Sequence, residues 1–309
     1  MNLKNIGLIG LGKMGSQMGH RILASGLPLF VYDSEKNKID DIAGKGGYVG
    51  ESVLDLAQKL AKPRVILLSV PAGKTIDEII EQLTPHLDNG DTIIDFGNSY
   101  FKDSQKRAND LAKKGVFFID VGVSGGPFGA RHGACLMIGG NASKVSDLDY
   151  LFMAISRDGA YEYFGKSGSG HLVKGFHNLI EYGYLQSLAE GLESLRVISE
   201  NENMEKISLE RVCDVWSKGS IIESRILLDA KKAFKKYPTL DEIDGSVYGQ
   251  TLEEMKNLTA ISTANGVKLY SCAAAVRARI DSQENPTYCG KIINAIRNIF
   301  GGHTDWNRQ

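Results

Sequence analysis

Hydrophobic and polar positions follow two different periods along the chain. In the first half, short apolar runs alternate with amphipathic segments, the pattern of a parallel sheet wrapped by helices. Strands are predicted at 5–10, 29–33, 64–70, 92–97, 117–123, 135–140 and 161–165, and helices at 14–25, 74–86 and 103–114. The first half therefore predicts an α/β fold with a mostly parallel sheet.

The strand pattern stops near Gly170. Apolar residues then recur at helical spacing over long stretches, notably 170–200, 206–216, 220–236 and 250–281. The composition changes at the sequence GKSGSG, which ends at Gly170. We expect an α/β domain over residues 1–168 and an all-α domain over residues 169–309.

A glycine-rich turn follows the first predicted strand and opens the first predicted helix. Glycines at this spacing allow a tight turn, close approach of the backbone to a pyrophosphate, and close packing of the helix on the sheet. The helix start adds free N–H groups and a positive dipole end. Residues 1–168 are thus predicted to form a Rossmann-type dinucleotide-binding domain. The predicted cofactor site comprises Gly10, Leu11, Gly12, Lys13, Met14, Gly15, Asp33, Val70, Pro71 and Asn98.

Asp33 ends the second predicted strand and bears on the choice of cofactor. An acid at this place accepts hydrogen bonds from the adenosine ribose and repels a 2′-phosphate. Ser34 and Glu35 supply no arginine for such a phosphate, so the sequence predicts NAD. Lys36 and Lys38 lie nearby, which keeps NADP as the alternative. A turn-capping aspartate is the non-functional interpretation.

Polar residues gather at the start of the helical half. Lys174, His177, Asn178 and Glu181 stand at positions i, i+3, i+4 and i+7, which places them on one side of a helix, with Tyr182 next to that side. Near apolar groups and a positive nicotinamide, a lysine favours its neutral form, which suits a general base. A glutamate one or two turns away can return a proton. A solvated polar stripe is the alternative interpretation.

A second glycine-rich segment, GVSGG at 122–126, follows a predicted strand. Glycines let a backbone approach a ligand closely, and Ser124 can donate a hydrogen bond to a substrate carboxylate. The alternative interpretation is an ordinary turn between strands.

The composition narrows the class of protein. The formal net charge is -1, so no basic excess exists to neutralise the phosphates of a nucleic acid. The cysteines are far apart and show no metal-ligand spacing, so we expect a reducing compartment and no metal. No apolar run is long enough to span a bilayer, and we expect a cytoplasmic protein without a membrane partner.

Several motifs resemble the 6-phosphogluconate dehydrogenase family within the β-hydroxyacid dehydrogenases. They cover nearly the whole chain: GLGKMG, DFGNS, DVGVSGGPFGARHGACLMIGG, GHLVKGFHNLIEYGYLQSLAE, WSKGSIIESRILL and RNIFGGH. The wider superfamily shares the first motif, the SGG and the lysine, whereas HNLIEYG and RNIFGGH resemble the phosphogluconate branch. At 309 residues the chain resembles the short bacterial-type form.

The resemblance implies oxidative decarboxylation of 6-phosphogluconate to ribulose 5-phosphate with reduction of NAD(P). Lys174 is implied as the base for the 3-hydroxyl, Glu181 as the acid that protonates the enediol at C1, and Asn178 as a third catalytic residue. The implied substrate-binding residues are Asn98, Ser124, Gly125, Gly126, His177, Tyr182, Lys256, Arg279, Arg297 and His303. In the family the terminal arginine and histidine reach the site of a partner subunit, which implies a homodimer or higher homo-oligomer.

One stretch, EEMKNLTA, departs from the family pattern. The family usually has a Gly-Lys/Arg-Trp-Thr run whose basic residue and threonine help to bind phosphate. Lys256 keeps the charge here, but Met255 and Asn257 replace the glycine and the tryptophan. Leu258 or Thr259 stands where the threonine is expected. Local drift on a helix and altered specificity are both open.

Two other functions follow from these open points. One is a related 3-hydroxyacid dehydrogenase that acts on a different, unphosphorylated acid. The other is a non-catalytic NAD-binding sensor, against which the paired base and acid speak, because a binding module needs neither.

Overall fold

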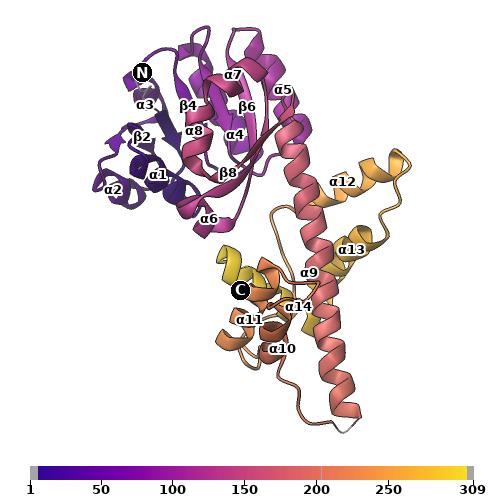
Figure 1. Ribbon diagram of the computed structural model, residues 1–309. Helices are drawn as coiled ribbons and strands as arrows, with labels where there is room; N and C mark the ends of the chain where they lie inside the picture. Colours follow the sequence, from indigo (N-terminus) through magenta and orange to yellow (C-terminus); the bar gives the residue numbers. More distant parts are fainter. Residues whose placement is uncertain (1–5, 203, 305–309) are drawn as a thin grey trace. The chain divides into compact units, whose positions relative to one another are not determined.

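The apolar runs of the first half form one sheet in a computed structural model that describes residues 6–202 and 204–304 (Figure 1). Within these residues the strand order is β3-β2-β1-β4-β5-β6-β7-β8. Adjacent strands are parallel except for the antiparallel pair β6 and β7. The mostly parallel sheet predicted from the sequence is confirmed. The strands are β1 (Ile6–Ile9), β2 (Leu29–Tyr32), β3 (Tyr48–Val49), β4 (Val65–Leu68), β5 (Thr92–Asp95), β6 (Phe117–Ser124), β7 (Ala134–Gly139) and β8 (Ser156–Gly165).

Helices cover both faces of this sheet, and its central strands are therefore buried on both sides. One apolar core joins the sheet to α1 (Gly15–Ala24), α2 (Lys36–Ala43), α7 (Ala142–Asp147) and α8 (Asp149–Ile155). A second core joins the opposite face to α3 (Val53–Lys59), α4 (Lys74–Leu83) and α5 (Phe101–Ala112). The remaining short helices are η1 (Thr84–His86) and α6 (Gly126–His132).

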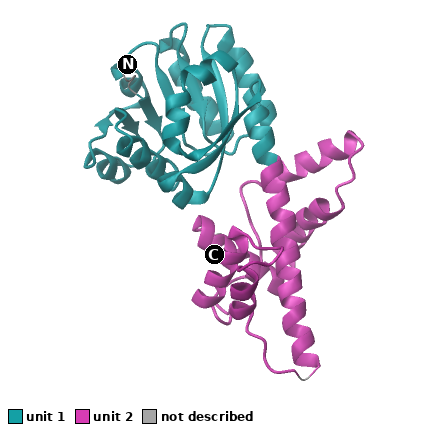
Figure 2. Ribbon diagram, viewed as in Figure 1, with its two compact units in different colours: residues 1–175 teal, residues 176–309 magenta. Residues whose placement is uncertain are grey.

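The chain divides into two compact units, Met1–Gly175 and Phe176–Gln309, so the division falls inside helix α9 (Ser169–Asn201) (Figure 2). The second unit is helical, with α10 (Leu209–Trp216), α11 (Arg225–Lys236), α12 (Leu252–Ala264), α13 (Tyr270–Glu284) and α14 (Tyr288–Gly301). Its core comprises buried apolar side chains of α9, α10, α11 and α14, among them Leu185, Leu192, Cys213, Leu227, Phe234, Ile292 and Ile296.

The helical stretch predicted at 250–281 is two helices rather than one. Helix α12 ends at Ala264, and Gly266 has a φ of 81°, a left-handed conformation that glycine adopts at helix ends. Helix α14 and strand β3 were not predicted. Among the residues that the structure describes, no helix combines the length and the apolar character needed to cross a membrane.

Candidate active site

The glycine-rich turn between β1 and α1 has the geometry of a phosphate cradle. Gly10 has a φ of +94°, and a Cβ placed on Gly15 would lie 2.0 Å from the Gly10 carbonyl oxygen, so neither position accepts a side chain. A Cβ on Gly12 would meet nothing within 4 Å. The backbone at Gly12 is therefore open to a ligand, as a bound pyrophosphate requires.

Asp33 is tied directly to this turn. Its Oδ2 accepts a hydrogen bond from the Leu11 backbone N–H at 2.6 Å, and its Oδ1 accepts one from the Glu35 backbone N–H at 2.9 Å. Lys38 pairs with the Glu35 carboxylate, which raises the pKa of the lysine, and its Nζ lies 3.9 Å from Asp33. The nearby positive charge is thus already engaged by two carboxylates.

The other residues predicted to bind the cofactor follow neighbouring strands. Strands β2, β1, β4 and β5 are consecutive and parallel, so their carboxyl ends share one edge of the sheet. Val70 and Pro71 follow β4 at this edge, and exposed Asn98 follows β5. Dinucleotides bind in the crevice outside such an edge. The residues present therefore fit a nicotinamide dinucleotide.

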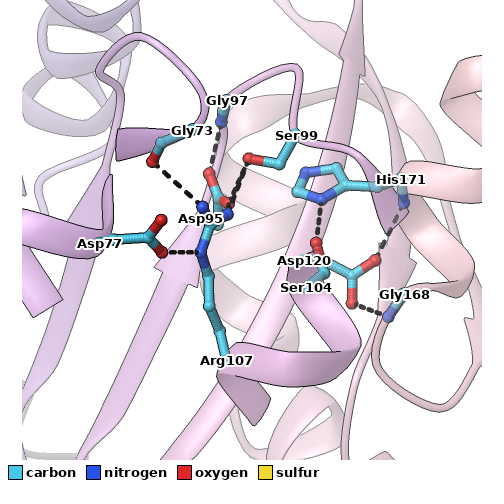
Figure 3. A network of polar contacts seen from close by, with 10 residues as sticks. All are labelled: Gly73, Asp77, Asp95, Gly97, Ser99, Ser104, Arg107, Asp120, Gly168 and His171. Carbon is cyan, nitrogen blue, oxygen red and sulfur yellow. Dashed lines mark hydrogen bonds and ion pairs between the residues drawn. The ribbon is translucent and has the colours of Figure 1, made fainter. Parts of the chain in front are cut away.

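The first turn of α9 packs against β6 and β7 through glycines and a buried carboxylate. Asp120 of β6 accepts hydrogen bonds from the backbone N–H groups of Gly168 at 2.6 Å and His171 at 2.9 Å (Figure 3). A Cβ on Gly170 would lie 2.4 Å from the Met137 carbonyl oxygen, which shows how closely the helix approaches the sheet. Asp120 thereby stabilises the helix start that carries the predicted base.

Lys174 lies directly against strand β6. A Cβ on Gly122 would lie 2.3 Å from the Lys174 Cβ, so the strand has a glycine where the lysine crosses it. Ser124 follows two residues later on the same strand and hence on the same face. The structure thus brings the GVSGG segment and the predicted base together within the first unit.

Gly122→Ala is expected to displace Lys174 and to lower kcat by about 100-fold, since a misplacement of 1 Å can cost that much in rate. The thermal midpoint is expected to fall as well, because the added Cβ would meet the Lys174 Cβ, which is attached to the helix backbone and cannot move aside as the tip of a side chain can. Gly191→Ala is the matched control: it lies on α9, and its Cβ would meet nothing within 4 Å. Steady-state rates and melting curves of both variants test this, and a fully active Gly122→Ala protein contradicts the packing argument.

The polar residues predicted to share one helical face lie on α9, which runs without a break through all of them. Lys174 and Asn178 are buried, whereas His177 and Glu181 are half-buried. The His177 Nδ1 lies 3.3 Å from the Asn178 Oδ1. Burial of both a lysine and an asparagine on this helix is unusual for a solvated stripe, because polar groups lose hydration when they are buried.

A cationic cluster forms within the second unit around Tyr182 of α9. The Arg279 guanidinium of α13 lies 3.3 Å from the centroid of the Tyr182 ring, and the Tyr182 hydroxyl lies 3.0 Å from the Thr251 Oγ1. A Cβ on Gly249 would lie 3.4 Å from the Tyr182 hydroxyl and 3.5 Å from the Arg297 Nη2, so the second arginine belongs to the same cluster. We call these four side chains, Tyr182, Thr251, Arg279 and Arg297, the arginine cluster.

Arg279 carries a buried positive charge. Burial lowers its pKa to about 10, and the positive charge of Arg297 acts in the same direction, while Tyr182 and Glu181 oppose it. Over residues 6–202 and 204–304, no carboxylate forms a salt bridge with Arg279. A desolvated cation is costly unless an anion compensates it, so the arginine cluster is arranged to receive an anion.

Two further residues predicted to bind substrate are Lys256 and His303. Lys256 is exposed on α12, and its Nζ donates to the Glu253 Oε2 at 3.1 Å. His303 follows the left-handed residue Gly302, and the Asn298 Nδ2 donates to its carbonyl oxygen at 3.0 Å. Arg297 lies in the arginine cluster of its own chain. The reach of the terminal arginine and histidine to a partner subunit, which the resemblance implies, stays a prediction. A homodimer stays a prediction.

Sequence reasoning missed several residues that organise these segments. Asp120 and Asp95 are carboxylates that lie inside otherwise apolar strands, in FFIDVGV and TIIDFG, and each is completely buried. Such a position is the signal that could have revealed them, because a charge buried in a strand needs specific partners. Thr251 carries no comparable signal, since its partner Tyr182 is 69 residues away along the chain.

Two family models match the sequence. One, described as the NAD binding domain of 6-phosphogluconate dehydrogenase, matches residues 5–165. The other, described as 6-phosphogluconate dehydrogenase, C-terminal domain, matches residues 187–308. The interval between the two matches, 166–186, contains the start of α9 with Lys174.

Curated relatives and a solved structure agree with these matches. The Haloferax volcanii protein "6-phosphogluconate dehydrogenase, NAD(+)-dependent, decarboxylating" is 33% identical over 301 residues, which cover 96% of this chain and 97% of the relative. The Haemophilus influenzae protein "6-phosphogluconate dehydrogenase, decarboxylating" is 41% identical over 62% of this chain, and the match covers only 42% of that longer relative.

The solved structure is Plasmodium falciparum 6-phosphogluconate dehydrogenase, described in its apo form and in complexes with its cofactor NADP+ and its substrate 6-phosphogluconate. It is similar to this chain with a TM-score of 0.78 and 27% sequence identity, over 91% of this chain and 62% of the other.

Proposed function

Since this chain belongs to the 6-phosphogluconate dehydrogenase family, we propose that it catalyses the oxidative decarboxylation of 6-phosphogluconate to ribulose 5-phosphate with NAD as the preferred acceptor. The arginine cluster is the observation that supports a phosphorylated substrate. Two buried guanidinium groups with a tyrosine and a threonine match the charge and the hydrogen-bonding capacity of a phosphate dianion. An unphosphorylated acid would leave Arg279 buried without a salt-bridge partner among the described residues.

The proposed chemistry begins with the loss of hydrogen from C3 of the substrate. The nicotinamide dinucleotide, when bound, accepts the hydride. Lys174 takes the proton of the 3-hydroxyl, and its burial against Gly122 keeps water from competing for that proton. Ser124 and Asn178 hold the hydroxyls and the carboxylate of the sugar acid in place. The product of this step is a 3-keto acid.

The keto acid then loses CO2. Protonated Lys174 donates a hydrogen bond to the carbonyl oxygen as negative charge develops there, which favours cleavage of the bond between C1 and C2 of the acid. The electron pair left by CO2 produces an enediol. Lys174 gives its proton to the oxygen as this enediol forms. Glu181, two helical turns after Lys174, then delivers a proton to the terminal carbon while Lys174 takes back the proton of the hydroxyl, which yields the ketopentose phosphate. One base and one acid on a single helix are sufficient for this series of reaction steps.

The departure at EEMKNLTA does not remove the phosphate site in this proposal. Lys256 pairs with Glu253 on an exposed face of α12, whereas Thr251, just before the same helix, hydrogen-bonds to Tyr182. Thr251 therefore takes the part that the family pattern gives to a threonine further along the chain. The basic residue of the pattern has no counterpart in the arginine cluster.

A spectrophotometric assay of 6-phosphogluconate with each cofactor tests the proposed function. NADH formation and CO2 release are expected with 6-phosphogluconate, and much slower rates with gluconate and small 3-hydroxy acids. A preference for the unphosphorylated acids would replace this function with that of a related 3-hydroxyacid dehydrogenase. Cofactor binding without turnover on any of these acids would favour a sensor.

Asp33→Asn is expected to shift the ratio of kcat/KM for NADP over NAD upward by roughly tenfold, because removing a negative charge near the 2′-phosphate changes its interaction by on the order of 1 kcal/mol. Asp40→Asn makes the same charge change on the exposed face of α2 and is the control. Both ratios come from initial rates with each cofactor. An unchanged ratio in Asp33→Asn would show that another residue selects the cofactor.

A further inference from the structure

Helix α5 carries a buried arginine that binds two loops at the cofactor edge of the sheet. The Arg107 Nε donates to the Asp77 Oδ1 at 2.7 Å, and its Nη2 donates to the Gly73 carbonyl oxygen at 3.1 Å (Figure 3). Its Nη1 lies 3.2 Å from the Ser99 Oγ and 3.4 Å from the Asp95 Oδ2. The planar guanidinium thus holds both the segment after β4 and the segment after β5.

The segment after β5 presents Asn98. The Asp95 Oδ1 accepts a hydrogen bond from the Gly97 backbone N–H at 2.8 Å, and its Oδ2 accepts one from the Ser99 hydroxyl at 2.7 Å. Gly97 and Ser99 are buried, while Asn98 between them is exposed. Asp95 and Arg107 therefore fix the backbone on both sides of the only exposed side chain in this described turn, 96–99.

One helical turn earlier, the same face of α5 reaches the start of α9. The Ser104 Oγ lies 2.7 Å from the His171 Nδ1, and both residues are buried. His171 stands three residues before Lys174, and its backbone N–H is one of the two that donate hydrogen bonds to Asp120. The His171 Nε2 has no hydrogen-bond partner among the described residues, so Ser104 alone orients the ring by hydrogen bonding there.

We propose that Ser104 and Arg107 are positioning residues that set Asn98 relative to Lys174. Their positions i and i+3 place them on one side of α5, so one rigid helix holds both functional segments. Arg107 acts through Asp95 and Ser99 on Asn98, and Ser104 acts through His171 on Lys174. The roles rest on the proposed function, which assigns Asn98 and Lys174 to the substrate.

Arg107→Lys is the informative change, because it keeps the buried charge and loses the planar fork that reaches several acceptors at once. We expect kcat to fall by roughly 10- to 100-fold, since small displacements of a substrate-positioning group have effects of that size. Lys106→Met, on the exposed side of the same helix, is the control and is expected to keep the wild-type rate. Melting curves verify that each variant is folded at the assay temperature.

A double-mutant cycle separates positioning from a purely structural role. If Arg107 acts through Asn98, then Arg107→Lys costs less than about threefold in kcat once Asn98→Ala is present, because contacts within one network are not additive. Ser104→Ala, which acts on Lys174, is expected to lower kcat by the same factor in the Asn98→Ala background as in the wild type. Additive losses for Arg107→Lys and Asn98→Ala, or a wild-type kcat in Arg107→Lys, would overturn the proposal.

The same series keeps the two proposals apart. The wild-type rate with 6-phosphogluconate tests the function, and the cycle is measured on whichever acid the wild type oxidises. Additive losses in an enzyme that oxidises 6-phosphogluconate overturn only the positioning role. If the wild-type protein prefers another acid, only the proposed substrate is overturned, provided that the kcat losses of Arg107→Lys and Asn98→Ala remain non-additive.

Discussion

Lys174→Ala is expected to lower kcat with 6-phosphogluconate by about 10³-fold, within the range that positioned general bases contribute. Lys174 is buried at the start of α9 against Gly122 of β6, and strands β4 and β5 separate β6 from β1, which precedes the turn proposed to bind the pyrophosphate. The variant is therefore expected to bind NAD with nearly the wild-type Kd. Rates from NADH absorbance and Kd values from calorimetric titration together test this separation of chemistry from cofactor binding.

Two companion variants sharpen this experiment. Lys174→Arg keeps a positive charge but cannot act as a base near neutral pH, so it is expected to be about as slow as Lys174→Ala. Lys166→Ala removes an exposed lysine just before the same helix and is expected to be fully active. A Lys174→Ala enzyme that keeps near wild-type turnover would show that another group takes the proton.

Arg279→Met is expected to raise KM for 6-phosphogluconate by roughly 100-fold or more, because removing one partner of a buried charge pair costs about 2–5 kcal/mol. The unbranched methionine keeps apolar packing against the Tyr182 ring, on which the arginine now stacks. The effect is expected on KM more than on kcat, since the phosphate is remote from C3. Arg277→Met, on an exposed face of the same helix, is the control.

The same substitution is expected to weaken substrate binding but not to lower the free energy of unfolding of the ligand-free protein. It is expected to raise that free energy by up to about 3 kcal/mol. Burial lowers the pKa of Arg279 to about 10, so at neutral pH the folded protein holds a charge in an unfavourable environment. The unfolded chain binds this proton more tightly, so this unfavourable contribution shrinks as pH rises above about 10. The stability advantage of Arg279→Met is therefore present at neutral pH and decreases in that alkaline range.

Inorganic phosphate provides a direct test of the anion site. A ligand that binds only the folded state raises the melting temperature, so phosphate is expected to stabilise the wild type and the Arg277→Met control. Arg279→Met is expected to show little or no phosphate-dependent shift. Equal stabilisation of all three proteins would mean that phosphate binds somewhere other than the arginine cluster.

The order of the strands and helices was largely available from the sequence, because the relevant signals are periodic and local. Alternating apolar runs predicted the mostly parallel sheet, and the structure confirms it. The spacing of Gly10, Gly12 and Gly15 predicted a tight turn that lets a pyrophosphate approach the backbone, and in the structure a Cβ is excluded at Gly10 and Gly15 while Gly12 stays open. The break between α12 and α13 escaped prediction, although Asn265-Gly266, a pair typical of turns, marks it in the sequence.

What the sequence determined by itself is the fold class and the placement of Lys174, His177, Asn178 and Glu181 on one helical face. Both follow from distances of a few residues, over which backbone geometry leaves little choice. Only the tertiary structure shows that Arg279 stacks on the Tyr182 ring and that Arg297 lies beside them, which the family resemblance implied but no local pattern in the sequence predicts. These contacts depend on how α9, α13 and α14 pack, because packing joins side chains that no local period relates.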